Sequence, residues 1–146
     1  MSVGVTGPED VSVLPQTADL LRRADAELLS AQFSSEPWEM FSHAHLAALR
    51  AGAALVAERG RPAGRGAPRT VWGMLDAVAP ELHALSALFA QSATLRSAVD
   101  AGRFELVTAT RAQRALAAAE QLVDAVRGAV EASRAESPDL AGATRR

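Results

Sequence analysis

Apolar residues recur at alternating steps of three and four along much of the chain, which is the spacing of one face of an α-helix. The clearest stripe comes late in the sequence and consists of Ala112, Leu116, Ala119, Val123, Val126 and Val130. A narrower one comes early and consists of Leu21, Ala24, Leu28 and Ala31. Charged residues occupy the remaining positions, so both stretches are predicted to be amphipathic helices with one buried face.

A long helix is predicted between these two, ending at about Arg59 because Gly60 and Pro62 follow. One face of this helix carries Trp38, Phe41, His45, Leu49, Gly52 and Val56, with small residues on both sides. Those small residues would let neighbouring helices approach closely. A third helix begins at Val71 and must break near Pro80, because proline removes a backbone hydrogen bond and clashes with the preceding turn.

Residues that can cap a helix N-terminus precede these segments. We expect Thr17 and Ser35 to cap the first two helices and Thr70 to cap the third. Thr108 is slightly preferred over Thr110 for the last helix. A short apolar connector before it, which could close one end of a bundle, consists of Phe104, Leu106 and Val107.

These elements predict an all-α protein, an up-and-down antiparallel four-helix bundle whose third helix is broken near Pro80. The bundle is expected over residues 17–134. Residues 1–16 are expected to form a flexible leader, and residues 135–146 a disordered tail. The composition agrees with helices, because 33 alanines stand against only four Phe, two Trp and no Tyr.

Composition also removes several kinds of chemistry. Without cysteine, the chain can form no disulfide, thiolate zinc site or cysteine nucleophile. All fifteen basic residues are arginine, so lysine Schiff-base chemistry has no residue to carry it. No stretch is long and apolar enough for a membrane span, and Glu9 and Asp10 stand where a signal peptide would be basic. We expect a cytoplasmic protein with no membrane contact.

The three histidines are the natural candidates for metal binding or acid–base chemistry. His43 and His45 are two residues apart and point in different directions on a helix, so they cannot chelate one ion. His83 could meet His45 in space, but a partly buried histidine that bonds to a neighbour is the favoured interpretation. We expect no metal, no other cofactor and no catalytic residue.

The strongest local anomaly of charge is residues 59–69, which hold Arg59, Arg61, Arg65 and Arg69 and no acidic residue, in a chain of net charge −2. Guanidinium groups pair well with phosphate oxygens, and a glycine-rich backbone can follow a nucleic acid. The segment lacks an aromatic residue for base stacking, so a solvated loop is the competing interpretation. These four arginines are the candidate nucleic-acid-binding residues.

Three parts of the sequence carry a family resemblance: the small-residue helix with the string His45-Leu46-Ala47-Ala48-Leu49-Arg50-Ala51, the arginine loop of residues 59–69, and the helix start at Thr70-Val71-Trp72 with Pro80-Glu81-Leu82. Together they resemble an uncharacterised actinobacterial branch of the HEPN superfamily. The resemblance covers about residues 17–134. It implies a four-helix domain, often dimeric, from a superfamily associated with RNA cleavage, RNA binding and defence systems.

The catalytic signature of that superfamily is an arginine followed after four to six residues by a histidine. No arginine of this chain has a histidine at that spacing, including Arg111 and Arg114 of the last helix. We therefore expect a non-catalytic HEPN-like domain that acts as an RNA-associated or protein-binding regulatory module. The alternatives are a structural homodimeric interaction protein and, less favoured, a diverged ribonuclease that uses His45 or His83.

Overall fold

The structure is a computed structural model that describes the backbone of residues 14–144 and the side chains of residues 14–136. It contains the helices α2 (Pro15–Gln32), α3 (Pro37–Arg59), α4 (Val71–Val78), α5 (His83–Gln91), α6 (Ala93–Asp100) and α7 (Ala109–Thr144). Single turns of 3₁₀ helix, η2 (Pro80–Leu82) and η3 (Phe104–Leu106), lie between them. The described residues form no strand, which confirms the all-α class.

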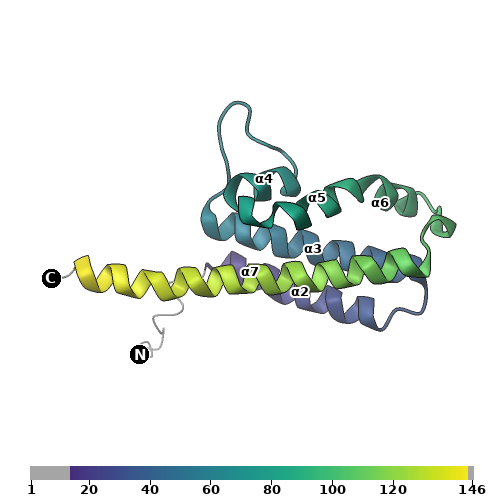
Figure 1. The fold of residues 1–146 in the computed structure, drawn as a ribbon, viewed down its shortest axis with the longest axis horizontal. Coiled ribbons are helices and arrows are strands. Elements are labelled where there is room, and N and C mark those ends of the chain that lie inside the picture. The colour runs from purple at the N-terminus through teal and green to yellow at the C-terminus, as the bar shows by residue number, and fades with distance from the viewer. Residues whose placement is uncertain (1–13, 145–146) are drawn as a thin grey trace.

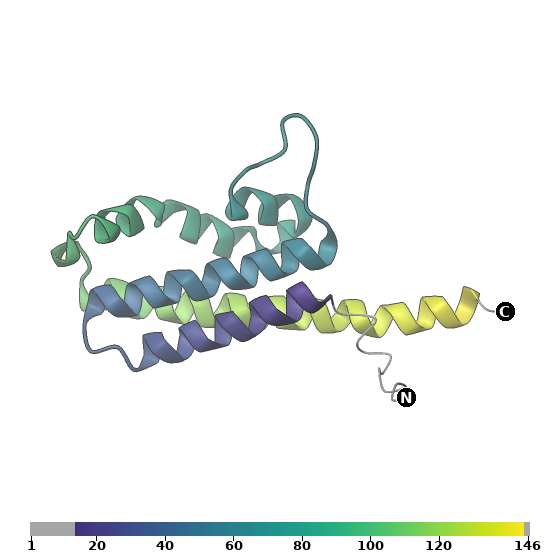
Figure 2. The ribbon, with the colours of Figure 1, turned by 180° about the vertical axis from the view of Figure 1, so that it is seen from behind.

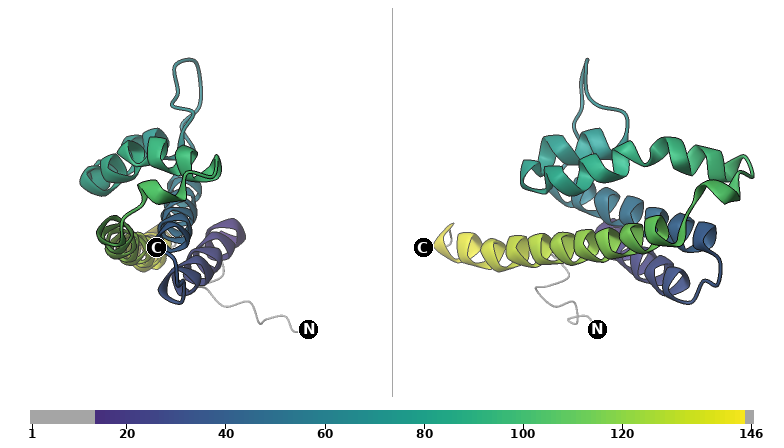
Figure 3. Two further views of the ribbon diagram at one scale, coloured as in Figure 1. Left: turned by 90° about the vertical axis from the view of Figure 1, so that its right-hand side faces the viewer. Right: turned by 45° about the vertical axis from the view of Figure 1, so that its right-hand side comes forward.

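Helix α3 lies at the centre of the molecule. Figure 3 shows α2 and α7 beside it on one side and the shorter helices α4, α5 and α6 on the other. Seen from behind in Figure 2, α2 lies along both α3 and α7. Because neighbours surround α3, its buried residues extend beyond one stripe: Phe41, Ala44, His45, Ala47, Ala48, Ala51, Gly52, Ala54, Leu55 and Val56.

Small residues on α3 allow its neighbours to approach, as the sequence predicts. A Cβ atom added at Gly52 would lie 3.0 Å from Val71 Cγ1 and 3.5 Å from both Trp72 Cζ3 and Leu75 Cδ2. The start of α4 therefore packs directly on the backbone of α3.

The break near Pro80 is confirmed, but the predicted third helix is divided more than once. Ala79 ends α4, η2 follows, and a further interruption at Ser92 separates α5 from α6. Together these segments run along α3 in Figure 1.

Two of the predicted caps are confirmed and two are wrong. Thr70 Oγ1 accepts the N–H of Gly73 at 3.0 Å, and Thr108 Oγ1 accepts the N–H of Arg111 at 3.1 Å. Thr17 instead lies inside α2, fully buried, where its hydroxyl donates to the carbonyl of Ala54 at 3.5 Å. Ser35 does not cap α3 either, because Glu36 holds the cap position without a side-chain bond.

Proline explains both errors. Pro15 and Pro37 occupy the first positions of α2 and α3. The φ angle of proline already suits a helix, and its missing N–H needs no partner in the first turn. A side-chain cap is therefore less necessary at these two helix starts.

The last helix buries the predicted stripe only in part. Ala112, Ala119, Val123, Val126 and Val130 are buried, whereas Leu116 is only partly buried. Leu122, which lies outside the predicted stripe, is fully buried. The true face of α7 therefore also includes Ala115 and Ala118, because α7 packs against both α3 and α2 and needs a wider apolar surface than a narrow stripe.

At its C-terminal end, α7 continues to Thr144, past residue 134, and so through most of the stretch that the sequence predicts to be disordered. Frequent alanine favours helix there, although Pro138 does not. Residues 1–13 of the predicted leader and residues 145–146 of the predicted tail lie outside the described residues. The boundaries of the bundle domain stay a prediction.

No helix in the part of the chain that the structure describes is both long and apolar enough to cross a membrane.

Candidate nucleic-acid interface

The loop between α3 and α4 stands away from the packed helices, as Figures 1 and 3 show. Its glycines Gly60, Gly64 and Gly66 have positive φ angles of 100°, 97° and 83°, a conformation that other residues rarely adopt. Gly60 ends α3, and its N–H donates to the carbonyl of Val56 at 2.9 Å. The backbone can therefore leave α3 abruptly and form an extended excursion.

The far end of the loop is held close to α4. Besides capping α4, Thr70 lies beside Gly73, where an added Cβ would be 2.8 Å from Pro68 Cβ and 3.2 Å from Thr70 Oγ1. The absence of a side chain at Gly73 lets Pro68 pack there. Arg69 therefore lies between Pro68 and Thr70, both of which pack beside Gly73 at the start of α4.

Arg59 differs from the other three candidate arginines. Its guanidinium donates to the carbonyl of Val78 at 3.0 Å and to a carboxylate oxygen of Glu81 at 2.8 Å. The bond from Arg59 is the main reason that the pKa of Glu81 lies below its ordinary value. Arg59 therefore links the end of α3 to the end of α4 and to η2 through its Nη1 atom.

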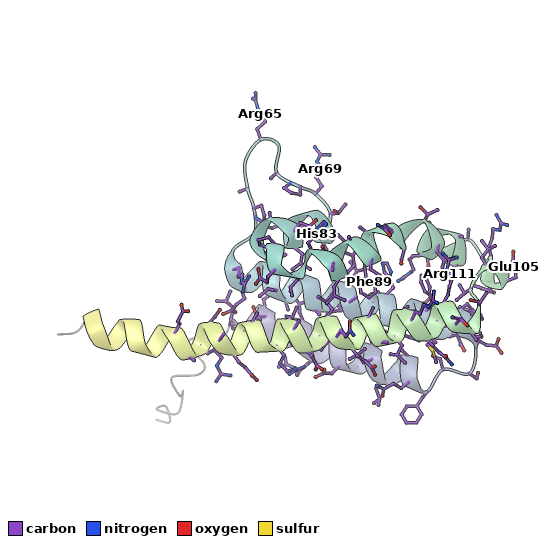
Figure 4. The ribbon with its side chains drawn as sticks, in the orientation of Figure 1. Arg65, Arg69, His83, Phe89, Glu105 and Arg111 are labelled. Atoms are coloured by element: carbon purple, nitrogen blue, oxygen red, sulfur yellow. The ribbon has the colours of Figure 1, made fainter. Side chains whose placement is uncertain are left out.

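Arg61, Arg65 and Arg69 make no ion pair with any residue that the structure describes. All three are exposed, and Figure 4 shows Arg65 and Arg69 extending away from the helices. Arg61 lies at the base of the loop, where it borders a cavity of about 280 Å³ together with Val71 and Met74. The structure thus keeps three unpaired guanidinium groups on one projecting segment.

His45 lies in the core, only 3% exposed, with its Nδ1 unpaired among the described atoms. Its ring is surrounded by three aromatic rings at centroid distances of 5.8–6.0 Å, those of Phe41, Trp72 and Phe89. Burial, followed by the positive charge of Arg96, lowers the pKa of His45 from 6.5 to about 4. The imidazole is therefore neutral at physiological pH and out of reach of a large substrate, and Nδ1 makes no bond to a neighbour.

The other two histidines have separate partners. His43 Nδ1 lies 2.7 Å from a carboxylate oxygen of Glu27, which links α3 to α2. His83 Nδ1 lies 3.1 Å from Asp76 Oδ1. Among the residues that the structure describes, no three His, Asp or Glu side chains are grouped so that they could hold a metal ion.

Asp76 also accepts a short hydrogen bond from the hydroxyl of Ser86, the main reason that its pKa lies below the ordinary value. Ser86 is fully buried and bonds to the carboxylate, not to the imidazole of His83. A nucleophilic triad needs the serine to face the imidazole. The cluster of Asp76, His83 and Ser86 therefore joins α4 to α5 and lacks the order of a hydrolase site.

Sequence reasoning missed a larger cavity of about 550 Å³ between α5, α6 and the start of α7. Arg111 and Arg114, which enter the sequence argument only because no histidine follows them, line this cavity. Periodicity along single helices could not reveal it, because the cavity depends on how three helices meet.

Comparison with protein families agrees with the fold. A family model described as SAV_6107-like HEPN matches residues 31–127, more than half of the chain. The matched range runs from the end of α2 into α7 and includes the arginine loop. No curated protein and no solved structure matches the chain significantly. On the strength of the family match over this helical core, the chain belongs to the HEPN superfamily.

Proposed function

We propose that this protein is a non-catalytic HEPN domain that binds RNA through the phosphate groups of the RNA backbone. The observation that carries the proposal is the projecting loop, on which Arg61, Arg65 and Arg69 are exposed and form no ion pair within the described part of the chain. Proteins use arginine guanidinium groups to contact phosphate, and such contacts give affinity without reading sequence. The loop has no aromatic residue for base stacking, so binding that is largely independent of base identity is expected.

Two features support the non-catalytic part of the proposal. The chain lacks the arginine–histidine signature that the superfamily uses for cleavage. His45, one of the two histidines considered for a diverged nuclease, is buried in an aromatic cluster with a lowered pKa. Without the arginine–histidine pair, and with His45 buried, we expect bound RNA to be held and not cut.

Outside the loop the chain is net acidic, so we expect the loop to contribute most of the contacts with RNA phosphate. The net charge of the chain is −2, which gives no general attraction for phosphate, and charges farther away than about one Debye length, ~8 Å at physiological salt, are largely screened. Binding by three contacts with a single strand should give a slope of log affinity against log salt near −2. Arg59 is left out of this count because it is already bonded to Glu81 and to the carbonyl of Val78.

The test is a titration of fluorescent single-stranded RNA at several salt concentrations. The triple variant Arg61→Gln, Arg65→Gln and Arg69→Gln should lose binding. A matched control changes the same number of charges at exposed arginines already paired with acids, namely Arg22, Arg23 and Arg103. The control should bind as the intact protein does. Absence of binding by the intact protein at low salt, or equal loss in both variants, would contradict the proposal.

A second candidate function, a homodimeric interaction protein, is favoured by an apolar patch at the end of α2. Phe33 is 82% exposed, and Leu29, one helical turn earlier, is 56% exposed. Large apolar groups in this arrangement are common at protein interfaces. Light scattering that shows a dimer, together with a monomer for Phe33→Asp, would support this function. A monomeric intact protein would remove it.

We also infer that α4, α5 and α6 together stand for the third helix of an up-and-down four-helix bundle. Figure 1 supports this, because the segments run along α3 in the direction opposite to it, and α7 returns. A cytoplasmic location and an actinobacterial origin stay predictions from the sequence.

A further inference from the structure

Two independent features meet at the cavity between α5, α6 and the start of α7. The first is its size, about 550 Å³, which lies within the range of about 300–1,000 Å³ typical of small-molecule sites. The second is the chemistry of its lining, which combines exposed apolar side chains with unpaired cations. This cavity is separate from the arginine loop. In Figure 1 the loop projects beside α4, at the other end of the row formed by α4, α5 and α6.

The apolar part of the cavity lining is exposed to water. Leu88 and Leu106, which are 41% and 37% exposed, both face this cavity. Leu95 of α6 and the core residue Phe41 complete the apolar wall. An apolar ligand body would cover these leucines and remove their surface from water, which favours binding.

Arg111 and Arg114 supply the cations. Neither forms an ion pair with a residue that the structure describes, and no acidic residue lines the cavity. Figure 4 shows Arg111 extending from α7 toward α6. Both residues lie within the first two turns of α7, whose N-terminal end carries partial positive charge. An anion beside these arginines would gain from the guanidinium groups and from the helix.

We propose that this cavity binds a small amphipathic anion, with its carboxylate or phosphate head at Arg111 and Arg114 and its apolar body against Leu88, Leu95 and Leu106. Thr94 and Gln91, which also line the cavity, can bond to polar atoms of the head. A planar guanidinium recognises an oxyanion through paired hydrogen bonds, so the head must be anionic and not merely polar. The apolar wall requires a hydrocarbon body in addition.

Titration calorimetry with octanoate and octyl phosphate tests the site and distinguishes the two heads. Octanol and octylamine are matched probes with the same chain and a neutral or cationic head. We expect at least one anion to bind about tenfold or more tightly than octanol, because hydrogen bonds to charged groups contribute most to affinity. Octylamine should bind more weakly still. Equal affinity for octanol and both anions, or no binding of any probe at millimolar concentration, would overturn the proposal.

Variants locate the binding. The double variant Arg111→Gln and Arg114→Gln should lose the preference for the anion, whereas the control Arg22→Gln and Arg23→Gln should keep it. Circular dichroism would confirm that both variants remain folded. Methyl NMR gives a second readout that does not depend on a variant. Octanoate should shift the methyl signals of Leu88, Leu95 and Leu106 and leave that of Leu29 unchanged; the reverse pattern would place the anion elsewhere and contradict this site.

Discussion

The imidazole of His45 is placed where a positive charge is poorly tolerated. It lies in the core among aromatic rings, and its Nδ1 has no hydrogen-bond partner within the described residues. Burial and Arg96 lower its pKa to about 4, while the carboxylate of Asp100 acts in the opposite direction. In the unfolded chain the same group would titrate near 6.5.

The lower pKa of His45 in the folded protein than in the unfolded chain predicts a loss of stability in acid. Between about pH 6.5 and 4 the unfolded state binds a proton that the folded state does not, so the free energy of unfolding falls as pH falls. Above pH 6.5 both states are neutral at this group, and it contributes no dependence on pH. The full loss from His45 is about 3 kcal/mol, from about 1.4 kcal/mol per unit of pKa difference.

The measurement is urea unfolding from pH 7.5 to 4.5 for the intact protein and for His45→Phe, which fits an aromatic cluster. The variant should lose less stability in acid than the intact protein. Leu122→Ala is the control, because Leu122 is fully buried and carries no titratable group, and this variant should lose stability at every pH without changing the dependence on pH. Parallel profiles for the intact protein and His45→Phe would rule out this role of burial.

At the scale of the element, α7 shows how the surroundings of a helix select its buried face. Leu122 is fully buried and Leu116 only partly so, although Leu116 fits the stripe that the sequence predicts. Charged residues of α7 reach across to α2: the guanidinium of Arg127 contacts both carboxylate oxygens of Asp25, at 2.8 and 2.7 Å. The helix therefore contributes both core packing and a surface ion pair.

We expect three graded effects on stability from substitutions in α7. Leu122→Ala should lower the free energy of unfolding by about 2–5 kcal/mol, because it leaves a cavity in the core. Leu116→Ala should cost less, and Arg127→Gln should cost no more than about 1 kcal/mol, the usual limit for an exposed ion pair. Denaturant unfolding measures all three. An effect of Leu116→Ala larger than that of Leu122→Ala would show that the face is assigned incorrectly.

At the scale of the whole molecule, the arginine loop is peripheral to the packing. Helix α3 before the loop contacts α4, α5, α6 and α7 after it, so the two parts of the chain share one core. The loop itself, from Arg61 to Arg69, contributes no buried residue. Cutting the loop should leave this core intact.

Limited digestion with trypsin tests whether the core stays intact when the loop is cut. Arg65 is exposed on the projecting loop, and Arg61 is protected by the following proline, so the first cut within the described residues should follow Arg65. The two fragments should stay together on size exclusion and keep the helical circular dichroism of the intact protein. Fragments that separate without denaturant would mean that the loop connection is needed for the fold.

Much of the architecture follows from local pattern. The helical class, the end of α3 at Arg59, the break at Pro80 and the caps Thr70 and Thr108 depend on residues close in the sequence, where proline, glycine and hydroxyl groups act on their own turn. The arginine loop is visible for the same reason, because its composition changes abruptly. The sequence by itself determines these features.

Only the tertiary structure decides what each charged or apolar group meets. The sequence presents Arg59 as one of four equivalent arginines, but folding brings it to Glu81, twenty-two residues away. Folding leaves Arg61, Arg65 and Arg69 without an ion pair to any residue that the structure describes. It likewise buries Leu122 in place of Leu116 and brings Arg111 and Arg114 to a cavity lined by residues of several helices. A periodic pattern gives the face of one helix, whereas these outcomes depend on which helices surround it and at what separation, and those contacts join residues far apart in the chain.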